Sequence, residues 1–143
     1  MNPAAAAPAP AITPLPAFSD NYLWLLARAG RAAIVDPGDA QPVLRALADR
    51  QLTLEAILVT HHHGDHVCGV ARLRAELRGD GARVYGPRTE RIDGVDVPLA
   101  GGDRIDVLGT SFSVLDVPGH TAGHIAYVAP ALDPPALFCG DTM

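Results

Sequence analysis

The sequence predicts an α/β protein of one domain in which short strands outnumber helices. Its 143 residues suffice to bury one core, and its 48% hydrophobic and 19% charged residues are typical of globular chains. Short apolar runs recur along the chain, separated by glycine and proline, whereas two segments carry helical spacing. No internal repeat is found. We therefore expect the helices to cover the faces of a strand-rich core.

The N-terminal third is predicted to contain a tail and three strands. Residues 1–10, rich in alanine and proline, suit a flexible tail and lack the basic start and continuous apolar stretch of a signal peptide. Residues 11–18 and 21–28 are predicted strands, because turn-favouring residues join them at 19–21. A third strand over 31–36 stops at a Pro-Gly pair.

Two helices are predicted between later strands. In residues 41–50, Val43, Leu44 and Leu47 form one apolar stripe, and a proline is acceptable in the first turn. In residues 69–78 the aliphatic side chains lie on one side and the arginines on the other. Strands separated by Gly- and Pro-containing turns are predicted at 54–60, 82–86, 103–108, 111–117, 124–129 and 136–140.

All six histidines lie in two stretches, THHHGDH at 60–66 and PGHTAGH at 118–124. Four histidines and an aspartate in one loop, directly after a buried strand, favour a metal site. In an extended segment residues i and i+2 point the same way, so His61 and His63 can bind one ion while His62 faces away. Asp65 and His66 are placed to reach a second ion. A fortuitous histidine tract is the alternative, which the interposed Gly-Asp pair and the preceding strand disfavour.

Further ligands must come from distant parts of the sequence. His120 can complete the first site, and Asp141, at the end of a strand, can bridge two ions about 3.5–4 Å apart. Taken alone, Asp141 would more often be a solvated strand-end carboxylate. A role behind the ligands, rather than direct coordination, is expected for Asp36, Thr60, His62 and His124.

Four other side chains are expected to be structural rather than functional. Cys68 and Cys139 are expected to pack as small apolar residues, with a thiolate ligand at Cys139 as the alternative. Trp24 and Tyr22 are expected in the core rather than at a substrate.

The motifs carry a family resemblance. THHHGDH, PGHTAGH and LFCGDT are similar to the signature of the metallo-β-lactamase fold. PLPAFSDNYLWLL, VDPGDA, VYGP and VPGHTAGHIAYV resemble the glyoxalase II branch, the hydroxyacylglutathione hydrolases, from about Ile12 to the last residue. The resemblance implies an αββα sandwich, of which residues 11–143 form an N-terminal, truncated portion.

Position by position, the resemblance implies a two-metal site. His61, His63 and His120 would bind the first ion, Asp65 and His66 the second, and Asp141 would bridge them. Zinc is the expected metal, with iron and manganese as alternatives. A further histidine and the glutathione-binding residues are expected beyond Met143. Cys68-Gly69-Val70 departs from the family pattern of two glycines and an asparagine, without touching an assigned ligand.

The activity that the resemblance implies is hydrolysis of S-D-lactoylglutathione to D-lactate and glutathione. Asp65 would act beside a hydroxide that the metals generate, and the thiolate can leave without a general acid. We expect the 143-residue chain alone to be an incomplete product of weak or absent activity, with an uncovered apolar sheet face. The alternatives are an enzyme similar to persulfide dioxygenases, with a single iron, and a non-catalytic metal-binding fragment.

Charge and cysteine content narrow the partners and the compartment. A net charge of −5 without a basic run argues against nucleic acid or an anionic membrane as a partner. The family resemblance implies a small-molecule glutathione thioester as the partner. No apolar run approaches the roughly 20 residues of a membrane span. Two cysteines make no disulfide framework, so a reducing cytoplasm is expected. The sequence does not determine the oligomeric state.

Overall fold

A computed structural model of the chain describes residues 10–17, 21–61, 69–89, 92, 94–117, 123–130, 132 and 135–138. Its helical elements are α2 (Ala40–Arg50), α4 (Val70–Glu76) and the 3₁₀ turn η1 (Arg78–Asp80). Its strands are β1 (Ala11–Ala17), β2 (Asn21–Arg28), β3 (Arg31–Val35), β4 (Thr53–Leu58), β5 (Arg83–Pro87), β6 (Val97–Leu99), β7 (Arg104–Val107), β8 (Thr110–Asp116), β9 (Ile125–Ala129) and β10 (Ala136–Phe138).

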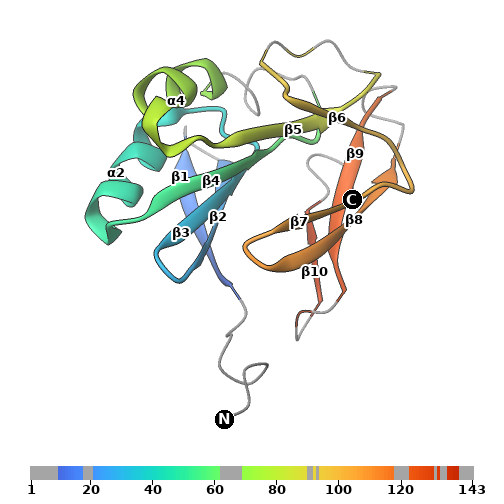
Figure 1. Ribbon diagram of the computed structural model, residues 1–143, viewed down its shortest axis with the longest axis horizontal. Coiled ribbons are helices and arrows are strands. Elements are labelled where there is room, and N and C mark those ends of the chain that lie inside the picture. Colours follow the sequence, from blue (N-terminus) through green and yellow to red (C-terminus); the bar gives the residue numbers. More distant parts are fainter. Residues whose placement is uncertain are drawn as a thin grey trace.

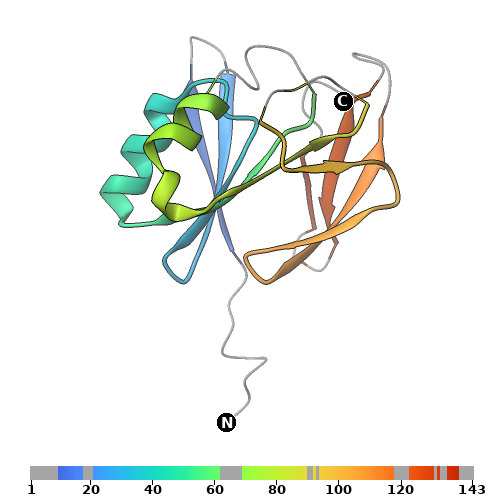
Figure 2. The same ribbon diagram turned by 45° about the horizontal axis from the view of Figure 1, so that its top comes forward.

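The strands form two sheets that pack face to face (Figure 1). Sheet A has the order β1-β2-β3-β4-β5-β6, antiparallel among its first three strands and parallel from β3 to β6. Sheet B has the order β10-β9-β8-β7 and is antiparallel throughout. Helices α2 and α4 lie side by side on the outer face of sheet A (Figure 2). The described part of the chain therefore has three layers: helices, sheet A and sheet B.

Two hydrophobic clusters hold these layers together. One lies between the helices and sheet A and contains Leu25 of β2 and Val43 of α2. The other lies between the sheets and contains Leu26 of β2 together with Phe112 of β8. Adjacent leucines of β2 enter different clusters because successive strand residues point to opposite faces of the sheet. The central strands β3 and β4 of sheet A are largely buried on both faces, which explains their nearly continuous apolar runs.

Most of the predicted helices and strands are present, and the elements that the sequence did not predict are short. Strand β6 was not predicted, because it has only three residues and includes Pro98; it lies at the edge of sheet A, where a missing amide hydrogen is tolerated. The prediction for Trp24 was wrong. Its side chain is 39% exposed on β2, opposite Pro14 of the edge strand β1, rather than in the core.

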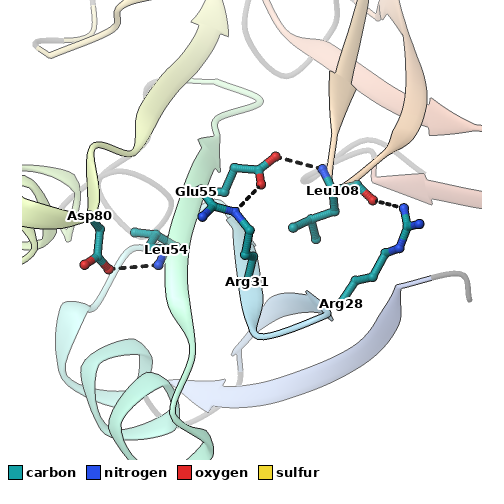
Figure 3. Close-up of polar contacts among 6 residues, drawn as sticks. All are labelled: Arg28, Arg31, Leu54, Glu55, Asp80 and Leu108. Carbon is teal, nitrogen blue, oxygen red and sulfur yellow. Dashed lines mark hydrogen bonds and ion pairs between the residues drawn. The ribbon is translucent and has the colours of Figure 1, made fainter. Parts of the chain in front are cut away.

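Polar contacts tie the β7–β8 turn of sheet B to sheet A (Figure 3). Glu55 of β4 accepts a hydrogen bond from the Leu108 backbone nitrogen (2.9 Å) and pairs with Arg31 of β3 (2.8 Å). Arg28 of β2 donates to the Leu108 carbonyl. Partial burial disfavours the charge of Glu55, but the bonds from Leu108 and Arg31 outweigh it and lower the pKa of this carboxyl. The two sheets are thus joined by polar contacts as well as by the apolar cluster between them.

Among the described helices, none is both long enough and apolar enough to cross a membrane.

Candidate metal centre

The first histidine of the THHHGDH stretch lies at the carboxyl end of β4. His61 is fully buried, as is Thr60 before it. The carbonyl of Thr60 accepts a hydrogen bond from the Ile125 nitrogen (3.0 Å), so β9 of sheet B closes over this end of sheet A. The strand end is therefore held by both sheets. A side chain placed there has little freedom to move, which suits a ligand position.

Asp36 reaches this strand end from the neighbouring strand. It follows β3, which is parallel to β4, so the two strands end at the same edge of sheet A. Its Oδ1 accepts from the Thr60 backbone nitrogen (2.7 Å) and its Oδ2 from the Thr60 hydroxyl (2.8 Å). The Thr60 hydroxyl oxygen lies 2.8 Å from Nδ1 of His61. A buried carboxylate is thus connected to the imidazole through one hydroxyl.

The backbone of Asp36 helps to aim its carboxylate. Its φ of 50° lies in the left-handed region, which aspartate adopts more readily than most residues. Its nitrogen donates to the Leu58 carbonyl (2.8 Å), and its carbonyl accepts from Gly38 (2.8 Å). The VDPGD segment therefore turns away from the sheet directly after Asp36.

His124, from the second histidine stretch, packs on His61. The two rings are stacked, with centroids 4.5 Å apart and planes 14° from parallel. Nδ1 of His124 lies 3.0 Å from the Ile125 carbonyl, and the side chain is buried. Histidines 63 residues apart in the sequence thus meet ring on ring. The stack holds the plane of His61.

Tyr127 is a further residue of this region that the sequence analysis did not single out. Its side chain is fully buried between the sheets, and its hydroxyl donates to the Val59 carbonyl (2.7 Å). Burial, and then the nearby carboxylate of Asp36, raise the pKa of Tyr127 well above its ordinary value. One signal was available in the sequence: alternation places Tyr127 on the face of Ile125, and a buried phenol needs an acceptor.

Gly69 brings the start of the second helical segment against the Asp36 turn. Its nitrogen donates to the Pro37 carbonyl (2.7 Å), and a Cβ at this position would lie 2.4 Å from that oxygen. Only glycine fits this approach. Residues 68–70 depart from the family pattern, but Gly69, the glycine that this packing requires, is present. Cys68 lies outside the described residues.

The structure brings together four of the predicted site residues, Asp36, Thr60, His61 and His124. The other six lie outside the described residues: His62, His63, Asp65, His66, His120 and Asp141. Cys139 lies outside them as well. Within the part of the chain that is described, no three histidine, cysteine or acidic side chains are grouped to hold a metal ion. The ligand assignments accordingly stay predictions.

The family model described as the metallo-beta-lactamase superfamily matches residues 18–143. The chain belongs to this superfamily. Membership of the metallo-beta-lactamase superfamily implies divalent metal ions and does not identify the metal. The predicted family of the chain is thereby confirmed.

Curated relatives of this chain carry names that specify one enzyme within the superfamily. The hydroxyacylglutathione hydrolase of Dechloromonas aromatica (strain RCB) is 56% identical over 129 residues, which are 90% of this chain and 46% of the relative. That of Pseudomonas putida (strain F1) is 58% identical over 135 residues, 92% of this chain and 51% of the relative. The chain spans about half the length of these curated relatives.

Solved structures of other proteins share the fold of this chain. The BLEG-1 B3 metallo-beta-lactamase superposes with a TM-score of 0.78 at 25% identity, over 93% of this chain and 73% of that one. ETHE1 from Myxococcus xanthus gives a TM-score of 0.69 at 28% identity, over 82% and 52% of the two chains. These likenesses confirm the predicted fold class, a partial metallo-β-lactamase domain.

Proposed function

We propose that the polypeptide carrying this chain is a metal-dependent thioester hydrolase that converts S-D-lactoylglutathione and water to D-lactate and glutathione. The observation that carries this proposal is the 53–58% identity to proteins named hydroxyacylglutathione hydrolase over about nine-tenths of the chain. The aligned region includes both histidine stretches and the Asp36 turn. The substrate is then a small glutathione thioester, and the compartment is the cytoplasm.

The described part of the centre fits a metal ion. His61 is a fully buried imidazole at a strand end, and the Thr60 hydroxyl occupies its Nδ1 side, so coordination would use Nε2. A carboxylate linked to an imidazole by hydrogen bonds is the arrangement that orients metal-binding histidines. Nitrogen and carboxylate donors suit zinc, with iron or manganese as alternatives.

The chain's own residues divide into three roles in this proposal. His61, His63 and His120 would hold one ion, Asp65 and His66 would hold the other, and Asp141 would be a ligand shared by both. Bound divalent ions would lower the pKa of water toward about 7, so that hydroxide is available at neutral pH. Asp65 would orient the attacking oxygen. Asp36, Thr60, His62 and His124 support the ligands, and the departing glutathione thiolate needs no protonation because thiol pKa values lie near 8.5.

The decisive experiment is a hydrolysis assay with S-D-lactoylglutathione. The 143-residue chain and a version joined to the C-terminal half of the Pseudomonas putida relative are each prepared metal-free and then reloaded with zinc, iron or manganese. We expect turnover by the extended protein that is lost on chelation and restored by metal, and weak or no turnover by the short chain. Full activity of the short chain would refute its predicted incompleteness.

A matched variant tests whether the histidine cluster is responsible. His63→Gln in the extended protein should abolish turnover and reduce the bound metal, whereas Gln51→Ala, at the far end of α2, should change neither. Metal retention without hydrolysis would favour the non-catalytic reading. One iron per chain, with oxygen consumption on a glutathione persulfide, would favour the dioxygenase alternative.

A further inference from the structure

The hydrogen bonds around Thr60 have a fixed direction. A threonine hydroxyl carries one hydrogen, and an ionised carboxylate can only accept. Oδ2 of Asp36 lies 2.8 Å from the Thr60 hydroxyl, and Oδ1 accepts from the Thr60 backbone nitrogen. The hydroxyl hydrogen is therefore used on Asp36, and the hydroxyl oxygen offers only its lone pairs to His61.

This direction determines which nitrogen of His61 carries the hydrogen. Nδ1 of His61 lies 2.8 Å from the Thr60 oxygen, which can only accept at that point. The bond forms only if Nδ1 carries a hydrogen and donates it. In a neutral imidazole the other nitrogen, Nε2, then carries the lone pair. Only that lone pair can coordinate a metal ion.

We propose that Asp36 and Thr60 are positioning residues that set the tautomer of His61, so that Nε2 is always presented as the ligand atom. The inference rests on the proposed function in one respect, that His61 binds a metal. The stack with His124 complements the tautomer control, because it prevents rotation of the ring plane (4.5 Å, 14°) while Thr60 holds Nδ1. Burial of all four residues keeps water from competing for these bonds.

Asp36→Asn is the sharpest test because it reverses the direction of the hydrogen bonds from Asp36 through the Thr60 hydroxyl to His61 without changing the shape of the side chain. The Thr60 backbone nitrogen can only donate, so the carboxamide oxygen of the variant must occupy the Oδ1 position. Its amide group then donates to the Thr60 hydroxyl, whose hydrogen turns to Nδ1 of His61. The hydrogen of His61 moves to Nε2, the coordinating atom. Asparagine tolerates the left-handed φ of this position, so the fold should persist.

The Thr60 pair gives an independent test. Thr60→Val keeps the outline of the side chain and removes the hydroxyl, so Nδ1 of His61 loses its acceptor. Thr60→Ser keeps the hydroxyl and should behave as the wild type. Asp39→Asn is the matched control for the charge change, because Asp39 lies in the same turn but caps α2 through Gln41 instead (3.1 Å). Thermal unfolding verifies that each variant is folded.

Two readouts are measured on the whole polypeptide that carries this sequence. The first is the ¹⁵N spectrum of the histidine side chains in the metal-free protein at pH 8, where an ordinary imidazole is neutral; the signals of His61 are assigned by their loss in His61→Gln. The second is zinc affinity, measured by competition with a chromophoric chelator.

We expect His61 to carry its hydrogen on Nδ1 in the wild type, in Thr60→Ser and in Asp39→Asn. In Asp36→Asn the hydrogen should move to Nε2, and Thr60→Val should lose the dominance of the Nδ1–H form. Both of these variants should bind zinc about 10- to 100-fold more weakly, as is usual when a partner of a ligating histidine is removed.

The outcomes separate this inference from the proposed function. Mixed tautomers of His61 in the wild type, or an unchanged Nδ1–H signal together with unchanged zinc affinity in Asp36→Asn, would overturn the inference, whatever the protein hydrolyses. Conversely, the expected tautomers and zinc affinities in a protein that does not hydrolyse lactoylglutathione would support the inference and remove the proposed function.

Discussion

At the scale of single residues, Tyr127 shows how buried polar groups are paired beside the candidate centre. Its phenol is fully buried and donates to the carbonyl of Val59, just before Thr60. Without the Tyr127 hydroxyl, the Val59 carbonyl would lose this hydrogen-bond donor in the buried interior. Because burial and the Asp36 carboxylate both disfavour a phenolate there, the side chain stays neutral well above the ordinary tyrosine range.

The raised pKa of Tyr127 predicts that the protein loses stability at alkaline pH. Above pH 10 the unfolded chain releases the Tyr127 proton at its ordinary pKa of about 10, whereas the folded chain retains it. The unfolded state then binds fewer protons, so the free energy of unfolding falls by up to about 1.4 kcal/mol per pH unit. The contribution of Tyr127 to stability is fully retained below pH 10. Urea unfolding at pH 9 and pH 11 measures this loss, and the absence of lysine from the chain simplifies the titration in this range.

Tyr127→Phe is the matched variant for that measurement. It should lower the free energy of unfolding at pH 8 by about 1–2 kcal/mol, because the buried Val59 carbonyl loses its donor. It should also show a smaller loss between pH 9 and pH 11 than the wild type. An identical pH dependence in both proteins would mean that Tyr127 does not cause the alkaline loss.

At the scale of elements, the β7–β8 hairpin depends on a two-residue turn that fits both its own strands and sheet A. Leu108 and Gly109 have φ values of 55° and 72°, as a tight hairpin with the right-handed strand twist requires. The backbone of Leu108 donates a hydrogen bond to Glu55 and accepts one from Arg28, both of sheet A. A Cβ at Gly109 would lie 2.1 Å from Nη1 of Arg28. The turn thus leaves room for the arginine only if residue 109 is glycine.

Gly109→Ala should therefore destabilise the protein more than a change of backbone preference alone would. The control is Gly30→Ala, at a similar φ of 79° but with no atom within 4 Å of the added Cβ. The control should cost about 1 kcal/mol through the left-handed conformation. Gly109→Ala should cost about 1 kcal/mol more, because Arg28 must leave the Leu108 carbonyl. Chemical unfolding of both variants measures the difference, and equal costs would show that the arginine contact adds nothing.

At the scale of the whole molecule, the outer face of sheet B differs from that of sheet A. Helices α2 and α4 cover sheet A, whereas no described helix lies on the other side of sheet B (Figure 2). Leu115 of β8 and Leu137 of β10 are 47% and 58% exposed, and half-buried Val128 lies directly beside Leu137. Apolar side chains are thus exposed on this face of sheet B in the described part of the chain. Such a face favours association.

We expect the 143-residue chain to self-associate through this face. The double variant Leu115→Thr/Leu137→Thr should lower the average mass seen in sedimentation velocity at micromolar concentrations, because both threonines suit a strand and reduce apolar exposure. Ile12→Thr, at an exposed position of β1 in sheet A, is the control. If the control lowers the mass as much as the double variant does, the association does not depend on sheet B.

Much of the local structure was accessible from sequence patterns, because those patterns act over a few residues. The stripe of Val43 and Leu47 placed α2, and the Gly- and Pro-containing turns on either side of residues 111–117 placed β8. Strand β6 escaped prediction since its three residues form a strand only by pairing with β5. Trp24 escaped since its exposure depends on lying beside the edge strand β1, which no local pattern encodes.

The candidate centre divides in the same way. The sequence by itself determined the superfamily and the position of His61 at a strand end, because these depend on residue types and short spacings, whereas the metal ligands assigned to the histidine stretches stay predictions. Only the tertiary structure decided that Asp36 reaches Thr60, that His124 stacks on His61 and that the Tyr127 hydroxyl donates to the Val59 carbonyl. Those contacts depend on the parallel register of β3 on β4 and on the packing of sheet B against sheet A. Both arise from pairings between residues far apart in the chain, whose free energy depends on the whole fold.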